Sequence, residues 1–246
     1  MKIPRYWHLA FLLPVSVLIA AGCSKNQSGQ TPTSADAPSG DISAEKLVGS
    51  VPFGAAEIFI EYNSSANDAG IQVFLDAEDW KRVDILDDHG RNILDIQAGG
   101  SMKELGLTEL RFEGAEPGPT EVFDVFPAGE YTFRGVTIDR EQLVGSATLS
   151  HDLPAAPVFS PSHGEVMDLD NVVVTWAPIA GVDSYQVIVE SDANSLVLEI
   201  SLSSGTTSMH VPPTFLAPNT LYKVEVLAIA PSGNRTLAEG TFVTGP

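Results

Sequence analysis

Cysteine, basic residues and long apolar runs are all scarce in this chain of 246 residues. Cys23 is the only cysteine, so no disulfide forms within the chain and each folded part depends on its hydrophobic core. Lys and Arg number 13 against 32 Asp and Glu, which gives a net charge of -19 at pH 7. Proteins bind nucleic acids mainly through Lys and Arg side chains, so this acidic composition argues against a nucleic-acid partner.

Catalytic motifs are also missing. The sequence has no Gly-x-Ser-x-Gly nucleophile elbow, no His-Glu-x-x-His pair and no Gly-rich phosphate loop before a helix. His163 lies beside serines in the stretch 160–164, and that stretch favours a polar surface loop over a nucleophile and base. The sequence therefore predicts a protein that is not an enzyme, with no catalytic residues and no cofactor.

Acidic loops are the one arrangement with possible ion chemistry. Calcium takes six to eight oxygen ligands, and no EF-hand spacing is present. Three clusters of acidic and amide side chains are present: two lie at opposite ends of one predicted hairpin, and the third lies in a turn. Because the first two clusters are separated, they do not form one calcium site. Solvated loops are therefore favoured, and no metal site is predicted. The three groups are Glu61, Asn63, Asn67 and Asp68; Asp76, Glu78 and Asp79; and Asp87 with Asp88.

The longest apolar run lies at the N-terminus. It covers residues 9–21, is interrupted by Pro14, and is shorter than the roughly 20 residues that cross a bilayer. Lys2 and Arg5 precede it, and the small residues 20–22 follow it. This order is typical of a cleaved signal peptide.

Cys23 directly follows Ala20-Ala21-Gly22, and this ending resembles the lipobox of bacterial lipoproteins. The resemblance implies that residues 1–22 are removed and that Cys23 receives a diacylglycerol and an acyl chain such as palmitate. Several acyl chains attach a protein stably to a membrane. Ser24, where Asp would imply inner-membrane retention, implies a lipid-anchored protein of the bacterial outer membrane. A cleaved secretory signal with an incidental cysteine is the alternative.

Residues 23–45 are rich in Ser, Gly, Pro, Gln and Asp, with Ile42 as the one large apolar residue. Such a segment buries too little surface to fold, and we expect a disordered tether. Its root-mean-square reach is on the order of 25 Å.

Residues 46–152 alternate short apolar segments with turn residues, which predicts a β-sandwich. Residues 127–133 resemble the Gly-x-Tyr-x-Phe strand of bacterial immunoglobulin-like modules. Phe123, Phe126 and Tyr131 are either core residues or an exposed partner site. Short helical turns are expected at 101–105 and 120–126, and strands at 57–62, 71–75, 80–86, 92–96, 109–112, 130–133 and 147–149.

Residues 153–246 begin at a Pro-rich joint and resemble a fibronectin type III domain. Trp176 in Trp176-Ala177-Pro178 matches the family's second-strand tryptophan, and Tyr185 lies on the next alternating strand. Leu216, Pro218 and Tyr222 match its Leu-x-Pro…Tyr pattern, which implies that Tyr222 is the tyrosine-corner residue. These five residues are predicted to be structural.

The sequence thus predicts an all-β protein with two antiparallel β-sandwich domains, immunoglobulin-like and then fibronectin type III, behind a lipidated tether. The expected function is that of a non-enzymatic binding or scaffold module of the bacterial envelope. Its expected partners are the membrane, through the anchor, and a protein or glycan. The rival hypothesis is a polysaccharide-binding accessory of an envelope hydrolase, or such a hydrolase itself.

Overall fold

The computed structural model describes residues 46–191, 193 and 195–246. Strands dominate these residues, which confirms the prediction of an all-β sandwich fold. The predicted signal peptide, Cys23 and the tether lie outside the described residues. Within the described part, no helix has both the length and the apolar character needed to cross a membrane.

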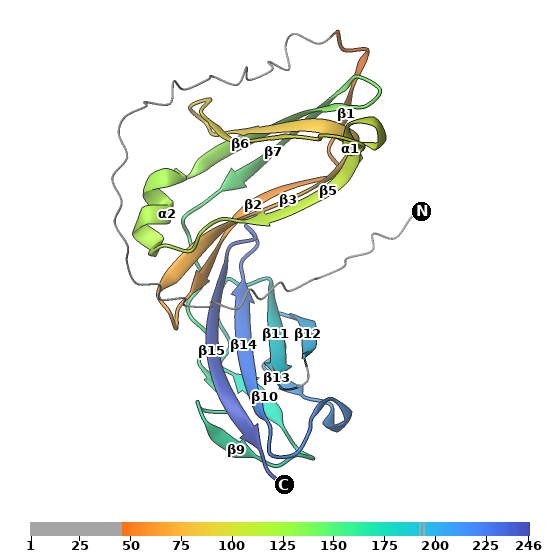
Figure 1. Ribbon diagram of the computed structural model, residues 1–246. Coiled ribbons are helices and arrows are strands. Elements are labelled where there is room, and N and C mark those ends of the chain that lie inside the picture. Colours follow the sequence, from red (N-terminus) through yellow and green to blue (C-terminus); the bar gives the residue numbers. More distant parts are fainter. Residues whose placement is uncertain (1–45, 192, 194) are drawn as a thin grey trace, which may run out of the picture. The chain divides into compact units, whose positions relative to one another are not determined.

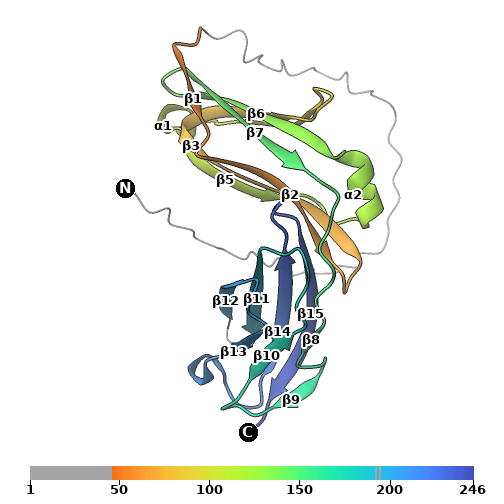
Figure 2. The same cartoon turned by 180° about the vertical axis from the view of Figure 1, so that it is seen from behind.

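The first sandwich consists of two sheets that share one long strand (Figures 1 and 2). The first half of β3 pairs with β2 and β5, and its second half pairs with β4 and β6. β7 pairs with β6, and β1 runs parallel to β7 at the edge. The elements are β1 (Gly49–Pro52), β2 (Ala55–Asn63), β3 (Asp68–Leu86), β4 (Asn92–Gln97), α1 (Met102–Leu105), β5 (Leu107–Glu113), α2 (Pro119–Val125), β6 (Gly129–Thr137) and β7 (Glu141–Leu149).

The strand β3 corrects one sequence expectation. Residues 71–75 and 80–86 were expected as two separate strands, but they belong to one strand of 19 residues. The register shifts between Asp76 and Trp80 in the pairing with β5, and between Trp80 and Arg82 in the pairing with β6. The polar segment 76–79 is therefore the bend at which the chain passes from one sheet to the other.

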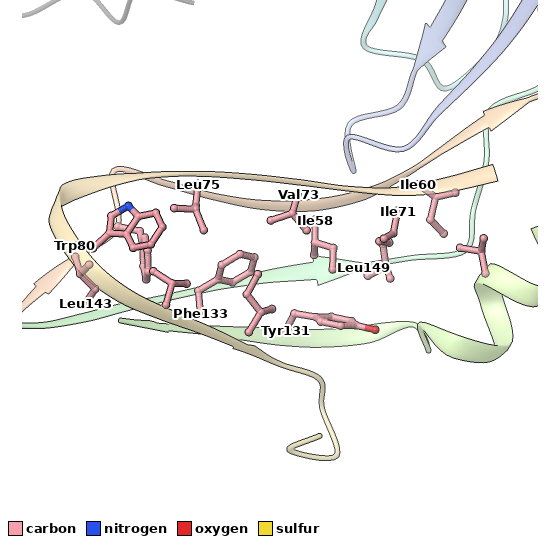
Figure 3. Close-up of a cluster of buried hydrophobic side chains, with 14 of the residues drawn as sticks. Ile58, Ile60, Ile71, Val73, Leu75, Trp80, Tyr131, Phe133, Leu143 and Leu149 are labelled. Carbon is pink, nitrogen blue, oxygen red and sulfur yellow. The ribbon is translucent and has the colours of Figure 1, made fainter. Parts of the chain in front are cut away.

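The core of the first sandwich lies between these two sheets (Figure 3). Alternate residues of a strand point to opposite faces, so one face of each strand supplies the apolar side chains. Burying each such side chain contributes about 1.5–3 kcal/mol relative to leaving it exposed. The side chains labelled in Figure 3 are Ile58, Ile60, Ile71, Val73, Leu75, Trp80, Tyr131, Phe133, Leu143 and Leu149, each at most 3% exposed.

The predicted hairpin around residues 87–90 is confirmed. Gly90 donates its backbone N–H to the carbonyl of Asp87 at 2.9 Å, and β3 pairs antiparallel with β4 on either side. Gly90 has a φ of 75°, a backbone conformation that glycine adopts without strain.

The second sandwich has a larger sheet in the order β12-β11-β14-β15, with β9 beside β15, and a smaller sheet in the order β13-β10-β8. Trp176, Tyr185, Tyr222 and Phe242 lie in a second, separate hydrophobic cluster between the two sheets. Its elements are β8 (Phe159–Ser160), β9 (Glu165–Met167), β10 (Val173–Trp176), β11 (Ser184–Ser191), β12 (Leu196–Ser203), β13 (Ser208–His210), η2 (Pro213–Phe215), β14 (Leu221–Ile229) and β15 (Arg235–Thr244).

Candidate functional site

The residues predicted to be structural in residues 153–246 lie around the second core. Trp176 and Tyr185 are buried, with ring centroids 5.4 Å apart. Leu216 is half-buried against the same cluster, whereas Pro218 is exposed and its carbonyl accepts a hydrogen bond from the Thr220 hydroxyl at 3.0 Å. Pro218 therefore contributes to the turn before β14 and not to the core.

Tyr222 has the geometry that a tyrosine corner requires. Its ring is fully buried, and its hydroxyl accepts the backbone N–H of Ala217 at 2.8 Å. Tyr131 has an equivalent arrangement in the first sandwich, since its ring is fully buried and its hydroxyl donates to the Pro127 carbonyl at 2.9 Å. Each hydroxyl fastens a loop to the strand that follows it.

The idea of an exposed aromatic site on the first sandwich is wrong. Tyr131 is in the core, while Phe123 and Phe126 are half-buried and pack against that core. Phe123 also stacks on the ring of His151 at 4.4 Å between centroids, and the Nε2 atom of His151 lies 2.8 Å from the Phe126 carbonyl oxygen. These aromatic rings close the end of the first sandwich.

Side chains of the loop between β2 and β3 form hydrogen bonds within that loop. The Oδ1 atom of Asn63 accepts the backbone N–H groups of Ser65 and Ala66 at 2.9 and 3.2 Å. The Oδ1 atom of Asn67 accepts the Tyr62 hydroxyl at 3.1 Å. These side chains therefore build the turn between β2 and β3.

Asp87, Asp88 and His89 form the one group of potential metal ligands found among the described residues. Both carboxylate oxygens of Asp87 already accept hydrogen bonds: Oδ1 from the backbone N–H groups of His89 and Arg91, and Oδ2 from Nε of Arg91 at 2.6 Å. Burial raises the pKa of Asp87, but the hydrogen bonds from Arg91 and the backbone outweigh burial, and the net shift is downward. These contacts assign Asp87 to holding the turn.

Backbone pairing and polar side chains join the two sandwiches at their junction. The described residues belong to one compact unit, and within it β2 of the first sandwich pairs in parallel with β15 of the second. The pairing joins residues 61–63 to residues 235–237. An edge strand exposes unpaired backbone groups, so this pairing covers an edge that each sheet would otherwise leave open.

Asn234 lies at the centre of the junction and is 1% exposed. Its Oδ1 atom accepts the backbone N–H of Ile60 at 2.9 Å, and its Nδ2 atom donates to the carbonyls of Ser150 and Asp152 at 2.9 and 3.0 Å. One side chain thus bonds a strand of the first sandwich and the segment that links the sandwiches. Thr236 extends the contact by donating its hydroxyl to the Pro154 carbonyl at 2.8 Å.

Arg235 adds a charged contact to the junction. Its guanidinium lies 4.3 Å from the centroid of the Phe59 ring, and its Nη1 atom lies 4.0 Å from a carboxylate oxygen of Glu61. Burial raises the pKa of Glu61 to about 7, with Arg235 lowering it and Glu113, Glu225 and Glu116 raising it. The tight turn before Arg235 needs Gly233, which has a φ of 88° and packs against Phe59.

Sequence reasoning missed Asn234. The sequence analysis made no prediction for this residue, because an asparagine in a turn is ordinary. The distinguishing feature is its set of partners more than 80 residues away, which no local pattern reveals.

A groove lies on the outer face of the larger sheet in the second sandwich. Its volume is about 530 Å³, and its lining includes Glu190, Ser191, Leu221, Lys223 and Thr241. Lys223 lies 2.6 Å from a carboxylate oxygen of Glu225, 3.1 Å from one of Glu239 and 3.7 Å from one of Glu190. The lining of the groove therefore combines charged side chains with the aliphatic Leu221.

Comparison with known proteins gives similarities of fold. No protein-family model matches the chain, and no curated protein matches it. Two similar solved structures contain fibronectin type III domains. The FN1–FN3 domains of chicken CNTN1 are 12% identical, with 82% of this chain and 67% of that chain covered and a TM-score of 0.34.

The two other similar structures also have low sequence identity to this chain. The two-domain fibronectin type III segment from chicken tenascin is 14% identical, with 77% of this chain and 97% of that chain covered and a TM-score of 0.29. A β-sandwich protein from a computer-based redesign is 24% identical, with 38% and 95% covered and a TM-score of 0.30. The all-β fold itself rests on the strand pairing described above.

Proposed function

We propose that this protein is a lipid-anchored, non-enzymatic scaffold of the bacterial outer membrane that holds two β-sandwiches as one rigid unit and presents them to a protein or glycan partner. The observation that carries the rigid unit is the set of hydrogen bonds made by Asn234. A flexible chain of two domains needs no buried side chain bonded to both domains and to their linker.

The energetics favour a rigid junction over a hinge. A hinge motion that keeps Ile60 in the core would break its bond to Asn234 and leave the Ile60 N–H without that acceptor. Leaving one such buried group unsatisfied costs about 1–3 kcal/mol. The parallel pairing of β2 with β15 and the stacking of Arg235 on Phe59 add further contacts that the same motion would break.

The anchor part of the proposal rests on the sequence around Cys23. The change Cys23→Ala should prevent lipidation and leave the protein unprocessed or released from the membrane. Fractionation of cells and mass measurement of the N-terminal fragment test this. Complete membrane partitioning of a processed Cys23→Ala protein would reject the lipobox.

The rigid unit is tested by distance measurements between spin labels in the full-length protein. Glu104→Cys and Ser204→Cys place one label at an exposed position in each sandwich. We expect one narrow distance distribution, and a wider one when Asn234→Ala is added. The exposed Asn92→Ala serves as the matched control and should leave the distribution narrow. A broad distribution with the native junction would reject the rigid unit.

A further inference from the structure

Three aliphatic side chains form a row across the outer face of the second sandwich, near its C-terminal end. Leu221 of β14, Val243 of β15 and Val166 of β9 are register partners on adjacent strands. Tyr222 and Phe242 are fully buried, so their neighbours Leu221 and Val243 point away from the core. Leu221 is 58% exposed and Val166 is 70% exposed.

This aliphatic row continues into the groove. Leu221 belongs to both, and Lys223 and Thr241 form the next cross-strand pair along the face. Because Leu221 belongs to both, the row and the groove are one continuous surface. Isolated exposed aliphatic residues are common on proteins, whereas contiguous exposed apolar patches are typical of interaction sites.

The charges beside the row are predominantly negative. Glu190, Glu225 and Glu239 surround the single cation, Lys223, which leaves an excess of two negative charges. Burial lowers the pKa of Lys223, but its hydrogen bonds and charge interactions with Glu225 and Glu239 outweigh burial and raise the pKa above its usual value. The lysine therefore stays charged and only partly neutralises the carboxylates.

We propose that this surface binds a segment of a partner protein in which aliphatic side chains alternate with Lys or Arg. The aliphatic side chains would cover Leu221, Val243 and Val166, and the basic ones would lie against the glutamates. This inference rests on the proposed function and names the class of partner that the scaffold binds. Charge complementarity argues against a second copy of this face, because two such surfaces repel each other.

The test uses the full-length protein and a short fluorescein-labelled peptide in which Leu and Val alternate with Lys. Binding is followed by fluorescence anisotropy at about 0.05 M and about 0.5 M salt, since higher salt screens exposed charges. We expect saturable binding that weakens with salt. Two matched peptides are measured beside it, one with Leu and Val replaced by Ser and one with Lys replaced by Glu, and both should bind at least about tenfold more weakly.

The location of binding is tested with a matched pair of variants. Leu221→Ser should weaken binding of the Lys-Leu-Val peptide about tenfold, because it removes apolar area that the peptide covers. Leu105→Ser is the control, since Leu105 is 68% exposed and lies in the first sandwich. Equal binding by both variants, equal binding of the Ser peptide, or no binding of the basic peptide would each overturn the proposal.

The peptide experiment and the spin-label experiment test the binding surface and the rigid unit independently. Narrow label distances without peptide binding would reject the class of partner and leave the rigid unit in place. Broad distances with specific peptide binding at Leu221 would reject the rigid unit and leave the binding surface in place.

Discussion

The side chain of Asn234 accepts a hydrogen bond from the backbone N–H of Ile60 at 2.9 Å, although 174 residues separate them in the chain. Ile60 is in the middle of a core strand of the first sandwich, and Asn234 is in a turn of the second. The bond lies just before the point where β2 and β15 begin to pair. It therefore satisfies a buried donor where the sheet ladder between the two sandwiches starts.

The first prediction is that Asn234→Ala lowers the free energy of unfolding by about 1–3 kcal/mol, because the Ile60 N–H loses its acceptor in a buried position. Loss of the junction should also uncouple the sandwiches, so that the single thermal transition broadens or splits. Differential scanning calorimetry of the full-length protein measures both effects. Asn92→Ala, at an exposed position, should change neither, and a similar effect of the two variants would contradict the assigned role of Asn234.

The second prediction concerns the two buried tyrosines. Tyr222→Phe should cost about 1–3 kcal/mol because the Ala217 N–H loses its acceptor, and Tyr131→Phe should cost a similar amount because the Pro127 carbonyl loses its donor. Tyr62→Phe is the control, since its hydroxyl bond to Asn67 is exposed to water. Denaturant unfolding at neutral pH ranks the three. A neutral Tyr222→Phe would reject the tyrosine-corner assignment.

The third prediction is that Trp176→Ala costs about 3–5 kcal/mol, the usual range for a large aromatic residue removed from a core. Trp176 is 5% exposed and packs against Tyr185. The same denaturant measurement tests it. A loss below about 1 kcal/mol would mean that the second core does not depend on this side chain.

Alternation of apolar and polar residues made most strands predictable, because each strand of a sandwich buries one face. Alternation does not identify a strand where polar residues follow one another. The polar segment 76–79 looks like a turn, yet it is extended because β3 crosses between sheets there. The short edge strand β1 was also missed, since its four residues include Gly49 and Pro52, which do not favour strands.

The junction could not be predicted for a different reason. Its partners come from three distant parts of the chain, around residues 60, 150 and 234, and each part is locally ordinary. The candidate ion ligands were visible in the sequence, but their hydrogen bonds were not. Only the structure shows that the side chains of Asn63, Asn67 and Asp87 accept hydrogen bonds within their own turns.

The fourth prediction is that calcium leaves the thermal melting curve unchanged. A ligand that binds only the folded state raises its stability, by about 2.7 kcal/mol at a hundredfold excess over the dissociation constant. We expect no such increase because the oxygens of Asn63 and Asp87 already accept backbone hydrogen bonds. Melts of the full-length protein with about millimolar calcium and with chelator are compared. A higher melting temperature with calcium would contradict this prediction.

The last prediction is that Glu61 makes the protein less stable as the pH rises toward neutrality. Burial and the neighbouring Glu113, Glu225 and Glu116 raise the pKa of Glu61 from 4.5 to about 7, against the opposing effect of Arg235. A carboxyl group with a raised pKa in the folded state contributes stability that is complete below its unfolded pKa and is lost as the pH rises through its folded pKa. The contribution should therefore disappear between about pH 4.5 and pH 7.

Glu61→Gln tests this, because the amide keeps the size of the side chain and cannot ionise. The difference in unfolding free energy between variant and native protein should shift in favour of the variant by about 1–3 kcal/mol between pH 4.5 and pH 8, since each unit of pKa shift corresponds to about 1.4 kcal/mol. Taking this difference removes the contributions of shifted groups that do not interact with Glu61, such as Asp87, because they titrate alike in both proteins. Glu57→Gln is the matched control, because it makes the same change at an exposed position on the same strand. The same pH dependence for both variants would contradict the raised pKa of Glu61 in the folded protein.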